Sequence, residues 1–276
     1  MKKQIKVLAV LSTAMFMAAV TPNFIGTAST AYAKTVGWTE ENGNWYYYDS
    51  YGEAITDTWK KNGDDWYYLD SDGIRAADRQ IDEYYVGEDG KRVSMKWVSV
   101  ENEDFWDEDD APEFLYYYYG RDGKALTSRW ASIDGSWYYF DAAGHAVKGW
   151  QSIDGYKFYF DENACTLVQN LEGILSAQSF QIVVDRARCQ VTVYAPDDGN
   201  GYIIPYRTFI CSPGKENSQT PTGTFKTTRK YRWHALVEST YGQYCTRLGN
   251  TSILFHSVPG KTTSIHNITA EEYNKL

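Results

Sequence analysis

Residues 130–141 read WASIDGSWYYFD, and this pattern decides the fold of the first half of the chain. The Asp-Gly pair in its middle suits the positive φ angles of a tight two-residue turn. The Trp-Tyr-Tyr-Phe segment after the turn is rich in residues that favour strands. The stretch is therefore predicted to be a β-hairpin.

The same pattern recurs across residues 37–170 with a period of roughly 20 residues, which is typical of a repeat array. A lone hairpin is marginally stable in water, so the copies must stack to bury a continuous aromatic spine. Residues 81–90 form a degenerate copy that keeps a Tyr-Tyr pair and an Asp-Gly pair. We expect residues 37–170 to form a solenoid of β-hairpins.

These repeats resemble the choline-binding or cell-wall-binding repeats of Gram-positive surface proteins. The resemblance implies that aromatic faces of adjacent hairpins box a quaternary ammonium through cation–π attraction. Other repeats of this kind bind sugars, so choline and wall glycans are both candidate ligands. Many of the aromatic side chains must also form the hydrophobic spine. By match of position, the ligand-binding residues are Trp38, Trp45, Trp59, Trp66, Trp130, Trp137 and Trp150.

Two copies depart from this pattern. The degenerate copy at residues 81–90 lacks the tryptophans, and the last copy has Lys157 and Phe158 where the earlier one has Trp137 and Tyr138. Each departure argues for a lost ligand site. Residues 101–115 are an insertion with eight acidic residues. Because the ordered spacing of a calcium loop is missing, we expect a solvated hairpin loop.

The composition shifts from aromatic to aliphatic at residues 171–179, which we interpret as a linker. Beyond it come short β-rich runs such as QIVV at residues 181–184, and no stretch has a helical apolar period. The fold class is therefore predicted to be all-β, with the hairpin solenoid followed by a mainly-β sandwich in residues 180–276.

Residues 252–257 read SILFHS, and the apolar run is expected to be a buried strand that delivers His256 to its end. An imidazole at this place is a candidate general base. Upstream, residues 211–214 read CSPG and residues 220–225 read TPTGTF. Together with Phe-His-Ser at 255–257, these segments resemble the catalytic domain of L,D-transpeptidases, the YkuD-like family.

The resemblance implies a two-step cysteine acyl transfer that cross-links the stem peptides of peptidoglycan, with no metal and no cofactor. It assigns His256 as the base and the backbone carbonyl of Ser257 as the group that holds its imidazole. It also places Tyr231, Trp233 and Tyr244 along the cleft, although core packing fits each of them equally well.

The chain departs from this family at the nucleophile. The family places its cysteine in a Ser-x-Gly-Cys-x-Arg segment downstream of the histidine, and no such segment occurs before Leu276. We therefore expect a catalytic domain that is incomplete at its C-terminus and a 276-residue form that is inactive. Two alternatives stay open. One is a non-catalytic, adhesin-like wall-binding protein, and the other is a hydrolase that uses Cys211 or Cys245.

Residues 1–33 combine a basic start, an apolar run and an Ala-Tyr-Ala site, which together predict a cleaved signal peptide rather than a stable membrane anchor. Residues 34–175 hold 13 basic and 29 acidic residues, whereas residues 176–276 hold 11 and 7. The acidic half disfavours nucleic acid. We expect secretion to the wall or surface of a Gram-positive bacterium. The spacing of the four cysteines matches no zinc site and favours buried free thiols or an adventitious disulfide.

Overall fold

The computed structural model describes residues 35–106, 111–214 and 219–264, so the predicted signal peptide lies outside the described residues. The chain divides into two compact units, with the boundary between Ala77 and Asp78. The first unit holds two antiparallel hairpins, formed by β1 (Gly37–Glu41) with β2 (Asn44–Tyr48) and by β3 (Thr58–Asn62) with β4 (Asp65–Leu69).

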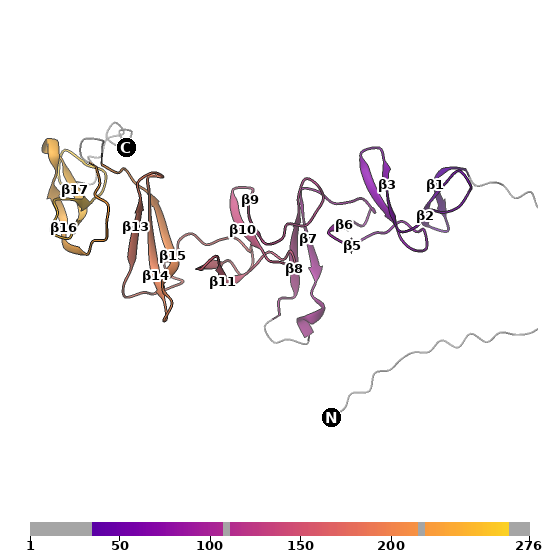
Figure 1. Cartoon of the computed structure of the whole chain (residues 1–276), viewed down its shortest axis with the longest axis horizontal. Coiled ribbons are helices and arrows are strands. Elements are labelled where there is room, and N and C mark those ends of the chain that lie inside the picture. The colour runs from indigo at the N-terminus through magenta and orange to yellow at the C-terminus, as the bar shows by residue number, and fades with distance from the viewer. Residues whose placement is uncertain (1–34, 107–110, 215–218, 265–276) are drawn as a thin grey trace, which may run out of the picture. The chain divides into compact units, whose positions relative to one another are not determined.

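The second unit continues with four more hairpins (Figure 1). Their strands pair antiparallel in sequence order, as β5 (Arg79–Ile81) with β6 (Tyr84–Val86), β7 (Lys96–Glu101) with β8 (Phe114–Tyr119), β9 (Arg129–Ile133) with β10 (Ser136–Phe140), and β11 (Gly149–Ile153) with β12 (Tyr156–Phe160). The expected β-hairpins are therefore confirmed, including the degenerate copy.

The turn chemistry follows the sequence. In the hairpin of β9 and β10, Asp134 and Gly135 have φ angles of 50° and 82°. Both values lie in the left-handed region, which a glycine adopts without strain because it lacks a Cβ. The acidic insertion lies between β7 and β8. It contains a 3-10 turn, η1 (Glu103–Trp106), in which Trp106 is exposed. Residues 107–110 of the insertion lie outside the described part.

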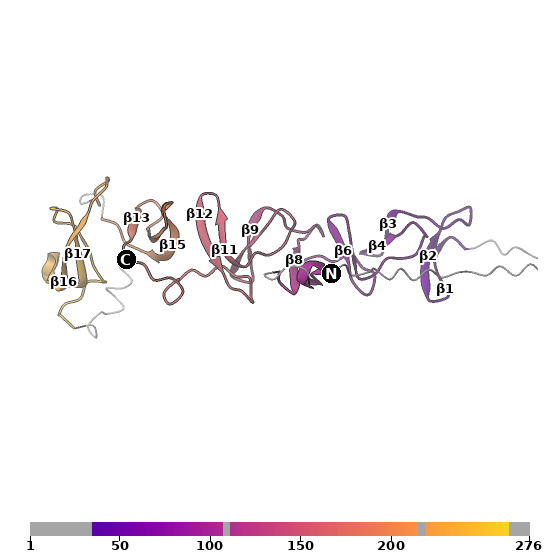
Figure 2. The same ribbon diagram turned by 90° about the horizontal axis from the view of Figure 1, so that it is seen from below.

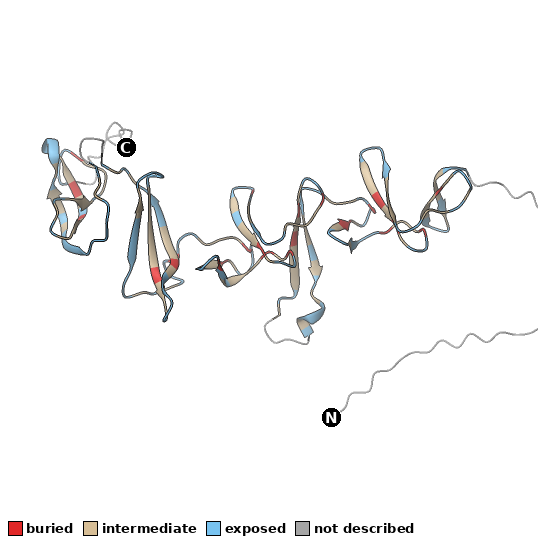
Figure 3. Ribbon diagram, in the orientation of Figure 1, coloured by how far each residue is buried: buried red, intermediate tan, exposed pale blue. Residues whose placement is uncertain are grey.

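The last residue of the second strand in each hairpin forms the spine of the array. This residue is apolar or aromatic in all six copies and is at most 5% exposed. The six residues are Tyr48, Leu69, Val86, Tyr119, Phe140 and Phe160. Figure 3 shows the buried positions as short red segments within mostly exposed or half-buried strands. Burial is thus concentrated in a narrow spine, as expected for stacked hairpins.

A short return segment after the hairpin of β9 and β10 ties it to the preceding hairpin. The amide of Ala146 donates to the carbonyl of Tyr116 at 2.8 Å, and the amide of Val147 donates to that of Tyr139 at 3.0 Å. The two bonds join the segment after β10 to strands β8 and β10. Within the second unit these two successive hairpins are therefore joined through the main chain, as expected for stacked repeats.

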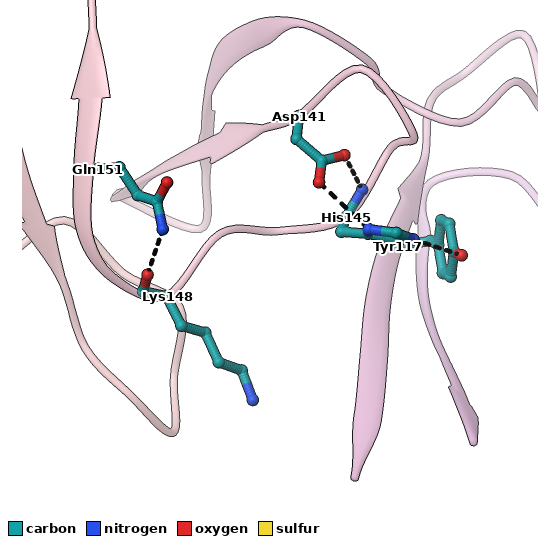
Figure 4. Close-up of polar contacts among 5 residues, drawn as sticks. All are labelled: Tyr117, Asp141, His145, Lys148 and Gln151. Atoms are coloured by element: carbon teal, nitrogen blue, oxygen red, sulfur yellow. Dashed lines mark hydrogen bonds and ion pairs between the residues drawn. The ribbon is translucent and has the colours of Figure 1, made fainter. Parts of the chain in front are cut away.

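Side chains strengthen this joint (Figure 4). Nδ1 of His145 lies 3.1 Å from Oδ2 of Asp141, and Nε2 of His145 lies 2.9 Å from the hydroxyl of Tyr117. Burial, and then the negative charge of Asp141, raise the pKa of Tyr117, so its hydroxyl stays protonated. Figure 4 also shows Gln151 donating to the carbonyl of Lys148, at 2.7 Å.

The C-terminal region consists of two three-stranded antiparallel sheets, which Figures 1 and 2 show as separate groups of strands. The first has the order β13 (Gln181–Asp185), β14 (Gln190–Asp197), β15 (Gly201–Ile210). The second has the order β16 (Thr227–Ala235), β17 (Tyr241–Leu248), β18 (Leu254–Phe255), with the turn η3 (Val237–Ser239) between its first two strands. The prediction of an all-β fold is confirmed.

The segment expected to be a linker packs against the first of these sheets. Leu171 is 1% exposed and forms a buried cluster with Ala195 and Ile204. Its amide donates to the carbonyl of Tyr206 at 3.0 Å. The last hairpin adds an ion pair between Lys157 and Asp197, with Nζ 2.7 Å from Oδ1. The join between repeats and sheet is therefore a packed contact at residue 171.

Candidate functional site

The second sheet places His256 at the end of its shortest strand. Strand β18 pairs with β17 through Phe255 opposite Thr246, and His256 follows directly. Its side chain is exposed, and its Nδ1 lies 2.7 Å from the backbone oxygen of Ser257. Because a carbonyl only accepts, the proton must sit on Nδ1. The Nε2 lone pair is then free to accept a proton.

Ser257 fixes this arrangement to the neighbouring strand. Its amide donates to the carbonyl of Gln243 at 3.1 Å, and its Oγ accepts from the amide of Gln243 at 2.9 Å. The same Oγ donates to the carbonyl of Val258 at 3.2 Å. The carbonyl that orients the imidazole is thus held by a network of backbone bonds. The sequence assigns the residue but shows nothing of this network.

Gly242 on β17 forms the floor beneath the histidine. A Cβ built on Gly242 would lie 2.8 Å from Cβ of His256, 3.0 Å from Sγ of Cys245 and 3.1 Å from Cδ1 of Leu236. All three distances are shorter than ordinary carbon contacts, so only glycine lets these side chains approach so closely. Sequence reasoning missed this residue, because a single glycine in a strand signals a close approach without naming the partner.

We expect Gly242→Ala to displace His256 and to lower the rate of any reaction that uses it by about 10-fold or more, since small misplacements of catalytic groups are costly. The measurement is the hydrogen-exchange protection of the Ser257 amide, which should fall. The matched control is Gly249→Ala. Gly249 has a φ of 53°, so an alanine there strains the backbone, but its Cβ would lie 4.0 Å from the nearest atom and would not displace the histidine. Unchanged protection in Gly242→Ala would contradict this account.

The described cysteines offer no activated thiol beside the histidine. All four are free, with Cys165 and Cys245 buried and Cys189 exposed, so the expectation of buried thiols holds for only part of the set. Cys245 and His256 both border Gly242, but the Cys245 side chain is fully buried, and burial raises the pKa of its thiol. Burial also raises the pKa of Cys211. Since the thiolate is the nucleophile, neither environment suits catalysis.

The segment before β16 is anchored at Thr220. Its Oγ1 accepts from the amide of Gly214 at 2.8 Å, and its carbonyl accepts from Nη1 of Arg186 at 2.7 Å. Of the three aromatic residues expected along the cleft, Tyr231 packs against His234 with ring centroids 4.6 Å apart, and Tyr244 is 72% exposed. Trp233 is half-buried on β16, in register with Gln243.

In the hairpins that have one, the first tryptophan packs on the strand that follows the turn. Within their own hairpins, Trp38, Trp59, Trp130 and Trp150 lie 5.1–5.5 Å, between ring centroids, from the second tyrosine of the following strand. Across hairpins, Trp38 contacts Tyr67 at 5.3 Å and Trp130 contacts Phe158 at 4.9 Å. Trp97, which the predicted ligand set omits, packs on Tyr138 in the same way. Edge-to-face and tilted ring contacts of this kind stabilise the hairpins.

The second tryptophan lies beside the turn, at the other end of the hairpin. Trp137 is 44% exposed, and Trp45 and Trp66 are half-buried. Trp137 and Phe158, from successive hairpins, line a cavity of about 270 Å³ together with Pro205. A second cavity, of about 510 Å³, is lined by Trp150, Lys157, Asp197 and residues 174–179. Trp137 is therefore the predicted ligand residue with the most open aromatic face.

Lysines of the chain itself cover some of the aromatic faces. The ammonium of Lys60 lies 3.9 Å from the ring centroid of Tyr47, and that of Lys148 lies 4.8 Å from Tyr116. Lys157 lies 5.6 Å from Trp150 while it pairs with Asp197. Each distance is within the range of cation–π attraction. The last hairpin thus uses Lys157 to join repeat and sheet, which accounts for its departure from the repeat pattern.

Among the described residues, no group of three or more acidic, histidine or cysteine side chains is placed to hold a metal ion. Within the same residues, the structure contains no helix of the length and apolarity needed to span a membrane.

Comparison with known families gives a match in each half of the chain. Residues 36–54 match the putative cell wall binding repeat, residues 55–92 and 126–168 match choline-binding repeats, and residues 179–271 match the L,D-transpeptidase catalytic domain. The chain therefore combines choline-binding repeats with an L,D-transpeptidase catalytic domain. No curated protein matches it.

Solved structures similar to this chain include the modular autolysin LytC from Streptococcus pneumoniae with a synthetic peptidoglycan ligand, at 17% identity and a TM-score of 0.41. They also include CbpJ from the same species, at 24% identity and a TM-score of 0.38. The matches cover 67% and 54% of this chain. The chain spans 39% of the length of LytC and 46% of that of CbpJ.

Proposed function

We propose that this protein is an L,D-transpeptidase that the repeats hold on the bacterial cell wall, where it cross-links the stem peptides of peptidoglycan. The observation that carries this proposal is the contact of His256 Nδ1 with the Ser257 carbonyl, 2.7 Å long, inside the segment that matches the catalytic family. This contact leaves Nε2 as a proton acceptor, which is what a general base requires.

In the proposed reaction a cysteine thiol loses its proton to Nε2 of His256 and attacks the carbonyl between the meso-diamino acid and the terminal D-alanine of a donor stem. A thioester forms, the amide C–N bond breaks, and D-alanine leaves with the proton from the imidazolium. A side-chain amine of an acceptor stem then attacks the thioester. The new amide forms and the thiol is regenerated.

The repeats would hold the enzyme at its substrate. Open aromatic faces such as that of Trp137 suit a trimethylammonium group, which binds through cation–π attraction and loses little hydration. Wall glycans are the other candidate ligand, because an aromatic face also accepts a sugar ring. Export by the predicted signal peptide to a Gram-positive surface completes the proposal.

Retention on immobilised choline tests the anchoring role. We expect the chain to bind a choline resin and to be released by free choline, whereas the uncharged isostere, in which tert-butyl replaces trimethylammonium, should release little. Trp137→Ala should elute at a lower choline concentration than Trp106→Ala, a matched change at an exposed residue of the insertion. Release by glycans alone would favour sugar binding, and a failure to bind both resin and isolated walls would overturn the anchoring role.

A non-catalytic, adhesin-like wall protein is the second candidate, favoured by the absence of an activated thiol among the described cysteines. The two candidates differ in acylation by a carbapenem, read as a mass shift of the intact protein. An adduct supports the enzyme. Its absence in a chain that carries the Ser-x-Gly-Cys-x-Arg segment supports the adhesin.

A further inference from the structure

One aromatic pair in the first unit is covered by an arginine of the chain itself. Trp45 on β2 and Tyr67 on β4 belong to successive hairpins. Cζ of Arg75 lies 5.6 Å from the ring centroid of Trp45 and 5.5 Å from that of Tyr67. Both distances fall within the range in which a cation is attracted to a ring face. The guanidinium thus holds the place where an external cation would contact both rings.

The backbone fixes Arg75 in this place. Arg75 pairs with Leu69 in a β-bridge, and its amide donates to the carbonyl of Trp45 at 2.8 Å. These bonds belong to the return segment that every hairpin has. Because they involve only main-chain atoms, they do not depend on the arginine side chain, and they set where that side chain starts.

Three other copies carry an alanine at the same place. The matching bridge after the hairpin is formed by Ala54, Ala125 and Ala146 in three copies, by Arg92 in the third copy and by Leu167 in the last. An alanine therefore suits this backbone, and its methyl group is too short to cover an aromatic face as the Arg75 side chain does. The backbone of the repeat therefore accepts residues other than arginine here, and the third copy also places an arginine over an aromatic ring, with Cζ of Arg92 5.1 Å from the ring centroid of Tyr84. A role for Arg75 in ligand selection is consistent with both observations.

We propose that Arg75 closes the site between Trp45 and Tyr67 to external quaternary ammonium ligands, as a built-in competitor. This inference rests on the proposed binding of choline by the repeats. A tethered cation acts at a high effective concentration. The array would then bind fewer choline molecules than its number of hairpins suggests.

The test is calorimetric titration of the whole chain with choline, comparing Arg75→Ala with the unchanged protein. We expect Arg75→Ala to bind one more choline per chain and its remaining sites to keep their affinity. Arg75→Lys, which retains a cation, should keep the original capacity. The charge control is Lys61→Ala at an exposed position on the neighbouring strand, which removes the same charge and should also keep the original capacity.

Equal capacity in Arg75→Ala and the unchanged protein would overturn the inference while leaving choline binding itself intact. An equal gain in Arg75→Lys or Lys61→Ala would also overturn it, because the gain would then not depend on a cation over the rings. If only Arg75→Ala binds choline, the inference holds and the proposed anchoring by the unchanged repeats fails. Binding by none of the four proteins would contradict both.

Discussion

His256→Ala, introduced into a chain that carries a Ser-x-Gly-Cys-x-Arg segment, is expected to slow acylation by a stem-tetrapeptide donor by about 10²–10⁴-fold, the usual cost of losing a general base. The expected loss follows from the position of Nε2, which is free to accept a proton while Nδ1 is held by the Ser257 carbonyl. The measurement is the rate of acyl-enzyme formation, followed as a mass shift.

The same substitution should leave the fold nearly unchanged. His256 is exposed, and the bonds that hold β18 and the following residues to β17 come from the main chain and from Ser257. Near-identical circular dichroism and thermal unfolding would therefore accompany the lost rate. Gln243→Ala is the matched control, since it shortens the neighbouring side chain but keeps the backbone bonds to Ser257. Acylation at the original rate in folded His256→Ala would assign the histidine a structural role only.

The repeat half of the fold could be predicted closely from its sequence because its determinants are local. A dipeptide such as Asp134-Gly135 sets the turn, and the β-forming residues on either side set the strands. The spine is also visible in the sequence, since one position per copy is always large and apolar. The join at Leu171 could not be predicted in the same way, because its burial depends on Ala195 and Ile204, which are distant in sequence.

The candidate sites were less accessible to sequence reasoning. The pattern treats Trp38 and Trp137 alike, but the structure packs the first between two tyrosines and leaves the second 44% exposed. The difference arises from how successive hairpins stack, which no single copy specifies. In the same way, the role of Gly242 depends on two neighbouring strands, and the position of Arg75 depends on rings from two hairpins.

Phe140→Ala is the substitution expected to destabilise the repeats most. Phe140 is fully buried at the end of β10, in a cluster with Ile133, Ala146 and Cys165, and its ring lies 5.8 Å from that of Trp97 in the preceding hairpin. Truncating a buried phenylalanine costs about 3–5 kcal/mol, because burial is lost and a cavity remains. That is a large share of the free energy of unfolding of a typical domain.

Because hairpins in such an array depend on their neighbours, the loss at Phe140 should spread to adjacent copies and lower choline capacity as well as stability. Urea unfolding followed by tryptophan fluorescence measures the first effect, and retention on choline resin measures the second. Phe140→Leu should cost only about 1.5 kcal/mol or less, since Leu69 fills the matching position in another copy. Phe105→Ala, in the acidic insertion, removes the same ring from a half-buried site outside the spine and should have a small effect. If Phe140→Ala unfolded at the same urea concentration as Phe105→Ala, the buried spine would not be the main source of the stability of the repeats.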